Sequence, residues 1–382
     1  MYSLHEYGQM IADKGRTEAY AEAIARAVRP GDVAVDLGSG VGFFALLACR
    51  AGARRVYAIE AADAVQWGKQ FAAANGFSDR IEFLQGDSRQ INLPESANLL
   101  ISDLRGALPF FRDAIPSIED ARQRFLAPDG RLIPQLDKLY AAIVDATMPY
   151  ATIMEPWRNS PCELDLSSIL PALLNTGHGG GRFSKSDLLT EPQEWCRLEY
   201  AMGPSKRAAA NIQFRTFRPG TGHGIWIWFD TQLFEDIGFT TGPEVKETIY
   251  GRILLPWPEP VSLKEGQRIE VELHADSVGG PYIWRWDTHF REENGQAWRD
   301  SFRQSTFQSA KFSHGALRRR SADFVPVLTE QGQAQGWMLQ AMDGKRSLEE
   351  IAREGVGRFP RAFRDEDDAL RVAGELSEKF TQ

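Results

Sequence analysis

The chain has 382 residues, 43% of them hydrophobic and 25% charged; the length excludes a single ordinary core and the composition excludes wholesale disorder. Its formal net charge of −8 excludes nucleic acid as the main partner, since phosphate binding needs a basic face. We interpret the local basic run at residues 318–320 as a solvated face.

Three cysteines without paired spacing predict no disulfide framework and no zinc or other metal site. The first residues lack the basic and then apolar pattern of a signal peptide, and no apolar run approaches membrane-spanning length. We therefore expect a soluble cytoplasmic protein with no membrane contact.

Residues 17–133 alternate between helical and strand periods. The pattern predicts, in order, a helix at 18–28, a strand at 32–37, a helix at 42–53, a strand at 54–60, a helix at 61–75, strands at 80–86 and 98–104, and a further helix and strand. Such alternation specifies parallel strands joined by right-handed crossovers. We therefore predict a doubly wound, Rossmann-like α/β domain over residues 1–135, including its N-terminal helices.

Short segments of alternating hydrophobicity follow this domain. They lie at 224–233, 248–255, 268–275 and 282–290, and they predict antiparallel strands of a sandwich or small barrel within residues 136–315. Residues 148–200 differ in composition and are predicted to form an excursion from this β domain. Residues 316–382 are helical in pattern, with a capping box at Ser347 and Glu350, and predict a small third domain.

Three glycines, Gly38, Gly40 and Gly42, follow the first predicted strand with the spacing G-x-G-x-G. A dinucleotide fingerprint has its third glycine one position later, where this chain has Phe43, whose bulk crowds a diphosphate. Asp36, just before the loop, would also repel phosphate and would suit a cationic group. The loop therefore indicates a nucleoside ligand with an uncharged link.

Two further carboxylates follow the next predicted strands. Glu60 ends the second strand, where it can accept both ribose hydroxyls, and Asp87 follows the third, where it can accept an adenine amino group. The implied ligand is an adenosine without phosphates but with a positive charge, a description that S-adenosylmethionine fits. A ligand-free strand–helix turn and an NAD site are the alternatives.

A resemblance to a known family rests on the segments QMIADKGRTEAY, VDLGSGVGFFALLACRAGARRVYAIE, INLP, LLISDLRG and RFLAPDGRLIP. Over the first 145 residues the chain resembles the catalytic domain of protein arginine methyltransferases, and the similarity continues more weakly to about Phe290. The resemblance implies an antiparallel β-barrel after the Rossmann-like domain, a helical dimerisation arm at 148–200 within the barrel, and a homodimer.

The resemblance also implies residues that bind the cofactor. By position, Met10 packs near the sulfonium, Arg16 clamps the methionine carboxylate, Gly38 and Gly40 let the backbone approach, Glu60 holds the ribose diol, and Asp87 and Ser88 lie beside the adenine. Local structural roles are the alternatives, with Arg16 on a surface helix and Asp87 in a turn.

The resemblance breaks where that family grips its acceptor guanidinium between two glutamates. The first position holds Asp103, and the second aligns with Arg112, a cation that would repel a guanidinium unless Asp113 replaces the glutamate. We predict that Asp103 contacts the acceptor as orienter or base. Arg105 and Arg112 suggest either an acceptor with negative charge or a salt bridge within the loop, and arginine stays open as the acceptor.

The Thr-His-Trp loop of the family is also missing. The segment GFTTGPEVKETIY aligns with it and places Glu244 at the histidine. A second candidate is His289, which shares one face of a predicted strand with Asp287 because they are two residues apart. His289 is either a general base or a paired structural histidine. Glu244 and His289 thus join Asp103 as candidate catalytic residues.

The C-terminal segment has a basic strand at 318–320, an apolar helix around Trp337, the pair Asp343 and Gly344, and a capped helix that begins RSLEEIA. It resembles the small PqqD-like domains that recognise leader peptides of ribosomally made, post-translationally modified peptides. The resemblance implies a winged-helix-like domain that binds a peptide as an added strand.

We therefore predict an S-adenosylmethionine-dependent methyltransferase with an altered acceptor site, acting on a side chain of a precursor peptide bound through the C-terminal domain. One alternative is a small-molecule methyltransferase whose C-terminal domain is structural. The other is a catalytically degenerate protein that binds the cofactor as a sensor.

Overall fold

The computed structural model describes residues 2–381 except 161, 181–182, 204–206, 246–247, 278–280, 292–297 and 310–312. The chain divides into two compact units, Met1–Ala310 and Lys311–Gln382. Within the described part, no helix has both the length and the apolar character needed to cross a membrane.

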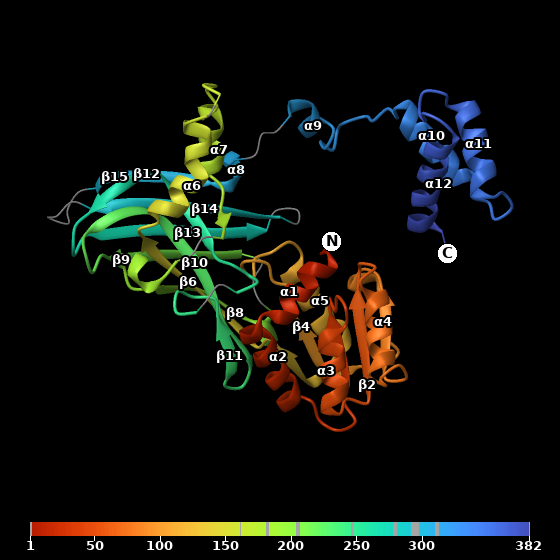
Figure 1. Ribbon diagram of the computed structural model, residues 1–382, viewed down its shortest axis with the longest axis horizontal. Coiled ribbons are helices and arrows are strands. Elements are labelled where there is room, and N and C mark those ends of the chain that lie inside the picture. The colour runs from red at the N-terminus through yellow and green to blue at the C-terminus, as the bar shows by residue number, and fades with distance from the viewer. Residues whose placement is uncertain are drawn as a thin grey trace. The chain divides into compact units, whose positions relative to one another are not determined.

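The N-terminal half of the first unit is a five-stranded parallel sheet in the order β3-β2-β1-β4-β5 (Figure 1). Its strands are β1 (Val33–Leu37), β2 (Arg55–Glu60), β3 (Ile81–Gln85), β4 (Ala97–Ser102) and β5 (Leu126–Ile133); its helices are α1 (Leu4–Ala12), α2 (Lys14–Ala27), α3 (Phe43–Ala51), α4 (Val65–Ala74) and α5 (Ala114–Phe125), with a 3-10 turn η1 (Ser88–Gln90). All five residues of β1 are buried, as in the middle of a parallel sheet covered on both faces. The sheet confirms the predicted α/β fold. Its order reverses between β1 and β4, where such sheets bind ligands.

The C-terminal half of the first unit consists of two antiparallel sheets. One has the order β7-β12-β10-β6-β8, with β11 paired to β10, and the other has the order β15-β14-β13-β9. The strands are β6 (Leu136–Val144), β7 (His178–Gly179), β8 (Gln193–Glu199), β9 (Arg207–Arg215), β10 (Gly220–Phe234), β11 (Ile237–Thr240), β12 (Ile253–Leu263), β13 (Arg268–Ser277), β14 (Tyr282–Arg291) and β15 (Trp298–Ser305), followed by α8 (Thr306–Ser309). The antiparallel strands are as predicted at 224–233, 268–275 and 282–290, but the segment predicted at 248–255 enters a strand only at Ile253, because residues 248–252 form a turn before β12. Their hydrogen bonds form two separate sheets in the described residues, so closure into one barrel is not confirmed.

Residues 147–192 leave the six-stranded sheet and return to it. They contain α6 (Thr147–Arg158), η2 (Ser167–Ile169), α7 (Leu170–Leu174), β7 and η3 (Lys185–Asp187), and Figure 1 shows α6 and α7 projecting from the sheets. The predicted excursion at 148–200 extends too far, because residues 193–199 form β8 and pair with β6. Trp195 and Leu198 are buried on that strand, which ends at η4 (Tyr200–Met202).

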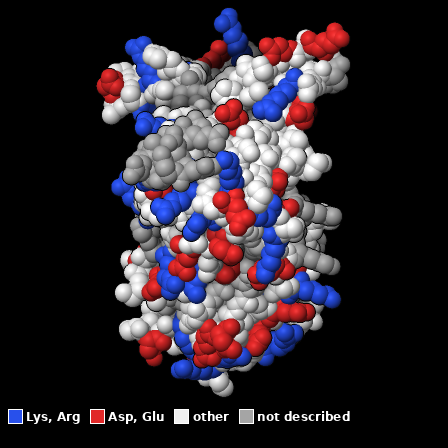
Figure 2. Space-filling model, turned by 90° about the vertical axis from the view of Figure 1, so that its left-hand side faces the viewer, with Lys and Arg blue, Asp and Glu red and all other residues white. Residues whose placement is uncertain are grey.

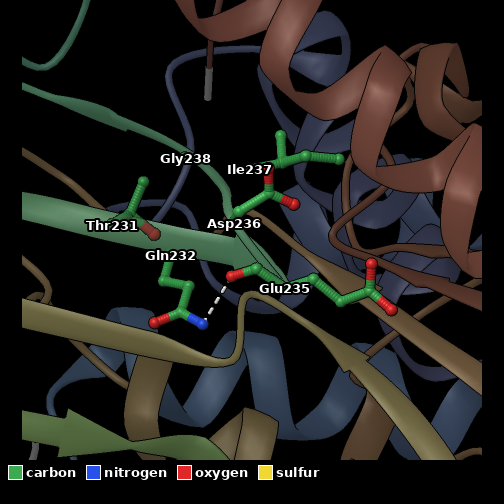
Figure 3. Close-up of a pocket in the computed structure, with 6 residues that line it drawn as sticks. All are labelled: Thr231, Gln232, Glu235, Asp236, Ile237 and Gly238. Carbon is green, nitrogen blue, oxygen red and sulfur yellow. Dashed lines mark hydrogen bonds between the residues drawn. The ribbon is translucent and has the colours of Figure 1, made fainter.

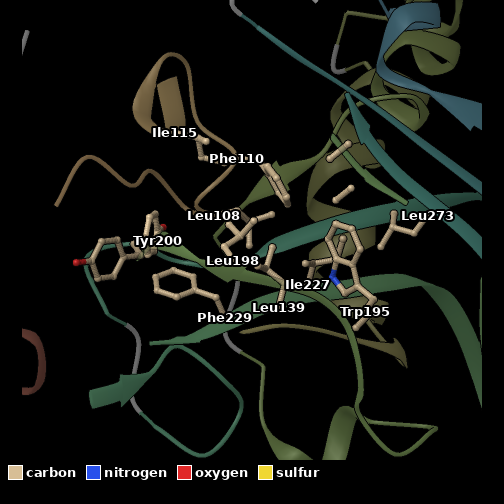
Figure 4. Close-up of a cluster of buried hydrophobic side chains, with 14 of the residues drawn as sticks. Leu108, Phe110, Ile115, Leu139, Trp195, Leu198, Tyr200, Ile227, Phe229 and Leu273 are labelled. Carbon is tan, nitrogen blue, oxygen red and sulfur yellow. The ribbon is translucent and has the colours of Figure 1, made fainter. Parts of the chain in front are cut away.

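One apolar core joins the two halves of the first unit (Figure 4). It includes Val35 from β1 and Phe110 from the loop after β4, together with Leu139, Trp195 and Phe229 from the antiparallel sheets. The rings of Phe110 and Trp195 have centroids 6.0 Å apart. The loop that was aligned with the acceptor loop of arginine methyltransferases is therefore fixed by side chains from both halves.

The second unit has its own small helical core. Its helices are α9 (His314–Arg318), α10 (Glu330–Ala341), α11 (Leu348–Arg358) and α12 (Glu366–Phe380). Met338, Ile351 and Phe363 are among the buried residues, and the predicted capping box of Ser347 and Glu350 is present. The described residues of this unit contain no strand: the segment at 318–320 ends α9 and turns, because its amides bond to carbonyls three or four residues earlier. The predicted basic strand is thus wrong, and a winged-helix fold is not confirmed.

Charged side chains of both signs are interspersed over the face in Figure 2. As far as this face is described, basic and acidic residues are mixed over it. Such mixing is ordinary for a solvated protein surface and gives this face no strong field of one sign.

Candidate active site

The glycine loop follows β1 at the reversal of the parallel sheet. Gly38 and Gly40 have left-handed φ values of +72° and +54°, which side chains rarely adopt. The Gly38 amide donates to the Ile59 carbonyl at 2.9 Å, and this bond ties the loop to the end of β2. A Cβ at Gly40 would lie 2.6 Å from the ring of Tyr7 on α1. The loop therefore presents bare backbone beneath an aromatic ring.

Two carboxylates lie against this loop. Asp36 is buried at the end of β1 and accepts a hydrogen bond from the Ala45 amide at 2.9 Å. Burial raises the pKa of Asp36 to about 7, although the Ala45 amide opposes this shift. Glu60 ends β2 and accepts from the amides of Gly40 and Ala62, each at 2.8 Å. Both carboxylates are held by backbone N–H groups, which leave lone pairs for a ligand.

Asp87 and Ser88 follow β3 at the same edge of the sheet. Asp87 is partly exposed and pairs with Arg89 at 2.8 Å. The hydrogen bonds from Arg89 hold the pKa of Asp87 below its usual value. Ser88 is buried, and its carbonyl accepts from Arg124 at 2.6 Å. The structure thus brings this pair to the sheet edge that carries Glu60, with Asp87 also serving in a turn.

Arg16 on α2 connects the N-terminal helix to the loop after β4. Its Nη1 donates to the Met10 carbonyl at 3.2 Å, and its Nε donates to Asp103 Oδ2 at 2.7 Å. Nη2 lies 2.6 Å from the same oxygen. Arg16 therefore contacts both Met10 and Asp103, two residues that were predicted separately from it. Arg16 is buried, so the surface-helix alternative is wrong.

Asp103 is already paired through both oxygens. Oδ2 accepts from Arg16 and from the Tyr250 hydroxyl at 2.6 Å, and Oδ1 accepts from Arg105 Nε at 3.2 Å. Burial would raise the pKa of Asp103, but the charges of Arg16 and then Arg105 outweigh burial and lower it. Asp103 is therefore an ionised carboxylate at neutral pH and a poor proton acceptor.

The two arginines of the loop differ sharply. Arg105 is buried, and it donates to Asp137 on β6 and to Thr231 on β10, each at 2.8 Å. The structure thus contains a salt bridge to Asp103 within the loop, one of the two interpretations of Arg105. Arg112 is exposed, has a φ of +44°, and places its guanidinium 5.0 Å from the Phe111 ring. Arg112 is the loop cation that solvent can reach.

The two other candidate catalytic residues lie in other parts of the β half. Glu244 is exposed and pairs with Lys185 at 2.6 Å. His289 lies on β14 in the four-stranded sheet, opposite Glu270 of β13 and Ser301 of β15. The side chains joined to Asp103 and Arg105 instead come from α2, β6, β10 and the loop before β12.

Sequence reasoning missed Tyr250 and Asp137. In the structure Tyr250, and not Glu244, reaches the acceptor loop, and the segment Thr248, Ile249, Tyr250 has the Thr-x-aromatic pattern of a Thr-His-Trp loop. That pattern was the available signal, and aligning on it corrects the placement of Glu244. Asp137 shares the buried side of β6 with Leu139, and a charged residue at such a position needs a buried partner.

A hollow of about 240 Å³ lies beside the β10–β11 hairpin (Figure 3). Its lining residues are Thr231, Gln232, Glu235, Asp236, Ile237 and Gly238. Thr231 alone among these also contacts Arg105 in the described structure. The glycine loop does not line the hollow, and we place the chemistry of the site at the sheet edge.

Comparisons with known proteins agree with this geometry. Residues 14–122 match the family model of the TRM5/TYW2 methyltransferase domain. A probable protein arginine N-methyltransferase 6 of Arabidopsis thaliana is 29% identical, over 60% of this chain and 54% of the relative. Protein arginine N-methyltransferase 6 of Xenopus tropicalis is 25% identical, over 70% of this chain and 82% of the relative. The chain thus spans about half the length of the first relative and most of the second.

Two solved structures share the fold. The Trypanosoma brucei PRMT1 enzyme–prozyme heterotetrameric complex with AdoHcy matches with a TM-score of 0.70 at 19% identity, covering 80% of this chain and 98% of that chain. Arabidopsis thaliana protein arginine methyltransferase 10 matches with a TM-score of 0.70 at 20% identity, covering 79% and 97%. The parallel sheet, the glycine loop and these matches define an S-adenosylmethionine-dependent methyltransferase. Within that class, the chain resembles the protein arginine methyltransferases.

The residues present fit S-adenosylmethionine. The backbone of Gly38 and Gly40 lies where side chains would clash with Leu104 and Tyr7. The Ser39 hydroxyl in the same loop is buried and has no hydrogen-bond partner in the described residues. A ligand that supplies polar atoms and a positive charge would satisfy this group and suit Asp36.

Proposed function

We propose that this protein transfers a methyl group from S-adenosylmethionine to a side chain of a peptide or protein, at a group other than a guanidinium. The observation that carries the proposal is the pairing of Asp103. Arginine methylation needs two carboxylates free to orient a planar cation, and here one is engaged by Arg16, Arg105 and Tyr250. The other position holds Arg112.

We assign the cofactor to the sheet edge, with the roles that the resemblance implies. Those residues are Met10, Arg16, Gly38, Gly40, Glu60, Asp87 and Ser88, and Asp36 joins them because its carboxylate suits a cationic group. The cofactor supplies an activated methyl group on a sulfonium. The chain then has to align an acceptor lone pair with that methyl and to exclude water. An imidazole or a carboxylate needs no strong base for this step, which agrees with the lowered pKa of Asp103.

Arg112 supports an acceptor segment with negative charge. It is the exposed cation of the acceptor loop and lies in a turn, with a positive φ. We give Glu244 and His289 no role at the methyl-transfer centre, because Glu244 is exposed beside Lys185 and His289 lies on the four-stranded sheet.

The second unit supports a peptide substrate. Between α9 and α10, Val325, Val327 and Leu328 are 81%, 87% and 62% exposed, in a segment without helix or strand. An exposed apolar segment outside the helices is suited to pair with an extended peptide. We propose that this unit binds the leader of a ribosomally made precursor peptide and so raises the local concentration of the acceptor.

We also propose a homodimer built through the excursion. Met148 and Leu164 are 73% and 62% exposed there, and a hollow of about 320 Å³ next to α6 is lined in part by Met148 and Ile153. On α4 the rings of Trp67 and Phe71, four residues apart, are also exposed. We take these exposed apolar groups as the candidate contacts of that interface.

The test uses S-adenosylmethionine with a deuterated methyl group, together with peptides and small metabolites extracted from the source organism. The full chain and a chain that ends at Ala310 would be run side by side, with mass spectrometry locating the label. Label on one peptide, lost on truncation, is the expected result. Label on a small metabolite would favour the small-molecule alternative, and tight cofactor binding without any consumption would favour the sensor.

A further inference from the structure

Arg105 is enclosed by groups that bind a guanidinium. Its Nε donates to Asp103 at 3.2 Å, and its Nη1 donates to Asp137 and to Thr231, each at 2.8 Å. Nη2 donates to the Tyr20 hydroxyl. Every nitrogen of the planar cation is thus paired, and two of the partners are carboxylates. Paired carboxylates with fixed geometry are what a guanidinium fork requires.

Aromatic rings complete the enclosure. The centre of the Arg105 guanidinium lies 5.3 Å from the ring centroid of Phe229, 5.7 Å from Tyr250, 5.8 Å from Phe239 and 5.9 Å from Tyr20. Rings at this range attract a cation through their electron-rich faces. These parts come from α2, β10, β11 and the loop before β12, so folding alone brings them together.

The enclosure adjoins the methyl-transfer centre through one shared carboxylate. Asp103 pairs with Arg105 on one oxygen and with Arg16 on the other. Within this group, the two cations Arg16 and Arg105 balance the two anions Asp103 and Asp137. A further cation entering beside them meets two guanidinium groups and no unpaired carboxylate of the group, which is unfavourable in a site of low dielectric constant.

We propose that Arg105 is a specificity-determining residue, which fills the guanidinium-binding place from within and so excludes arginine and other cationic acceptors. The inference deepens the proposed function and depends on it for the position of the methyl group. It names the substrate class as neutral or anionic side chains. The guanidinium that occupies this site is the side chain of Arg105 itself.

The first experiment removes the Arg105 side chain and adds a free guanidinium compound to fill the space. We expect Arg105→Ala to lower the Tm, and millimolar methylguanidinium to raise it again by about 2–5 °C, as ligand binding to the folded state requires. Methylammonium, which lacks the planar fork, is expected to give no rise. If Arg105→Ala does not fold alone, refolding with methylguanidinium against methylammonium is the same test.

Arg131→Ala is the matched control. Arg131 is also largely buried and pairs with one carboxylate, that of Asp32 at 2.7 Å. We expect methylguanidinium to leave the Tm of this variant and of the unaltered protein unchanged. No recovery in Arg105→Ala, or an equal rise in Arg131→Ala, would overturn the proposal.

The second experiment measures selection directly. Synthetic peptides that differ only in one central residue, Arg, Lys, His, Gln or Glu, are incubated with labelled S-adenosylmethionine and the full chain. We expect label on the Arg and Lys peptides to stay at least about a hundredfold below the best acceptor, since juxtaposed like charges cost several kcal/mol. Arginine labelling at a comparable rate would overturn the inference. If methylguanidinium raises the Tm of Arg105→Ala but no peptide is labelled, the result would instead count against the proposed function.

Discussion

The carboxylates on the two sides of this site are held in opposite ways. On the cofactor side, Asp36 accepts a hydrogen bond from a backbone amide in the first turn of α3, and Glu60 accepts from backbone amides of nearby loops. On the acceptor side, Asp103 and Asp137 accept from arginine and tyrosine side chains that belong to distant elements. The first pair is held by uncharged donors and can meet a cationic ligand. The second pair is neutralised by the chain itself.

The difference shows that one sheet edge serves two purposes. Backbone amides position the cofactor-side carboxylates without adding a compensating charge, so a ligand with a sulfonium and an ammonium is favoured there. Arginine pairing makes the acceptor side a rigid joint between the two halves of the first unit. This joint stabilises the fold and limits which acceptors can approach.

The largest expected effect tests the joint. Asp137→Ala removes a fully buried partner of Arg105 and leaves an excess positive charge in the joint. We expect the free energy of unfolding to fall by about 3–5 kcal/mol, measured by urea unfolding with tryptophan fluorescence. Asp236→Ala is the control: its side chain is 83% exposed beside Arg26, and we expect a loss below about 1 kcal/mol. Equal losses would contradict the comparison.

A smaller effect is expected from the glycine loop. Gly40→Ala combines a left-handed φ with a Cβ that overlaps Tyr7, whereas Gly76→Ala has a φ of +73° and no atom within 4 Å. We expect losses of about 2–3 kcal/mol for Gly40→Ala and about 1 kcal/mol for Gly76→Ala. Only Gly40→Ala should also weaken cofactor binding in calorimetry. Normal cofactor affinity in Gly40→Ala would separate the loop from the cofactor site.

The pKa of Asp36 predicts a pH dependence on the cofactor side. Its pKa of about 7 lies above the usual value of 3.8, so the folded, cofactor-free protein holds a proton that the unfolded chain releases. Stability of that form should therefore fall as the pH rises from about 4 to about 7. A cationic cofactor favours the ionised carboxylate, so its affinity should rise about tenfold between about pH 6 and about pH 8.

Asp36→Asn should remove this dependence. Calorimetric titration with S-adenosylmethionine at several pH values would measure it, with Asp63→Asn as a control on a more exposed carboxylate past β2. If the affinity for S-adenosylmethionine rises with pH as steeply in Asp36→Asn, the titrating proton belongs to another group.

The smallest effect is expected at Glu244. Its side chain is 60% exposed, so Glu244→Gln should change stability by less than about 0.5 kcal/mol and cofactor consumption by less than about twofold. A large loss of turnover in Glu244→Gln alone would restore Glu244 to the methyl-transfer centre.

Tyr250→Phe removes the hydroxyl that donates to Asp103 and should lower the free energy of unfolding by about 1–2 kcal/mol.

The parallel sheet and the glycine loop could be predicted from the sequence because their signals are local. The strand before Gly38 is a buried run, the glycines follow at once, and Glu60 ends the next strand. Helices α11 and α12 were likewise visible in spacing and capping. A hydrophobic repeat of two residues predicts the buried face of a strand, and a repeat of 3.6 residues predicts the buried face of a helix. These patterns are nearly sufficient to predict a parallel sheet.

The acceptor side could be predicted only in part. Asp103 was recognised by its position, but its partner Tyr250 is 147 residues away, and Arg16 and Tyr250 are 234 residues apart. No local pattern encodes such contacts, since they depend on how β6, β10 and β12 pack. Short segments failed for a related reason: the run at 318–320 has no periodicity, and its turn follows from hydrogen bonds within α9.

Helix α1 has no fully buried residue. It is held by its capping box at Ser3, by Tyr7 over Gly40, and by the bond from Arg16 to the Met10 carbonyl. Its amide protons should therefore exchange with solvent long before those of β1 and β4, which exchange only when the core opens. In the proposed cofactor site, α1 is thus the part that opens at least cost, and we expect cofactor entry and release to proceed while the joint around Arg105 stays closed.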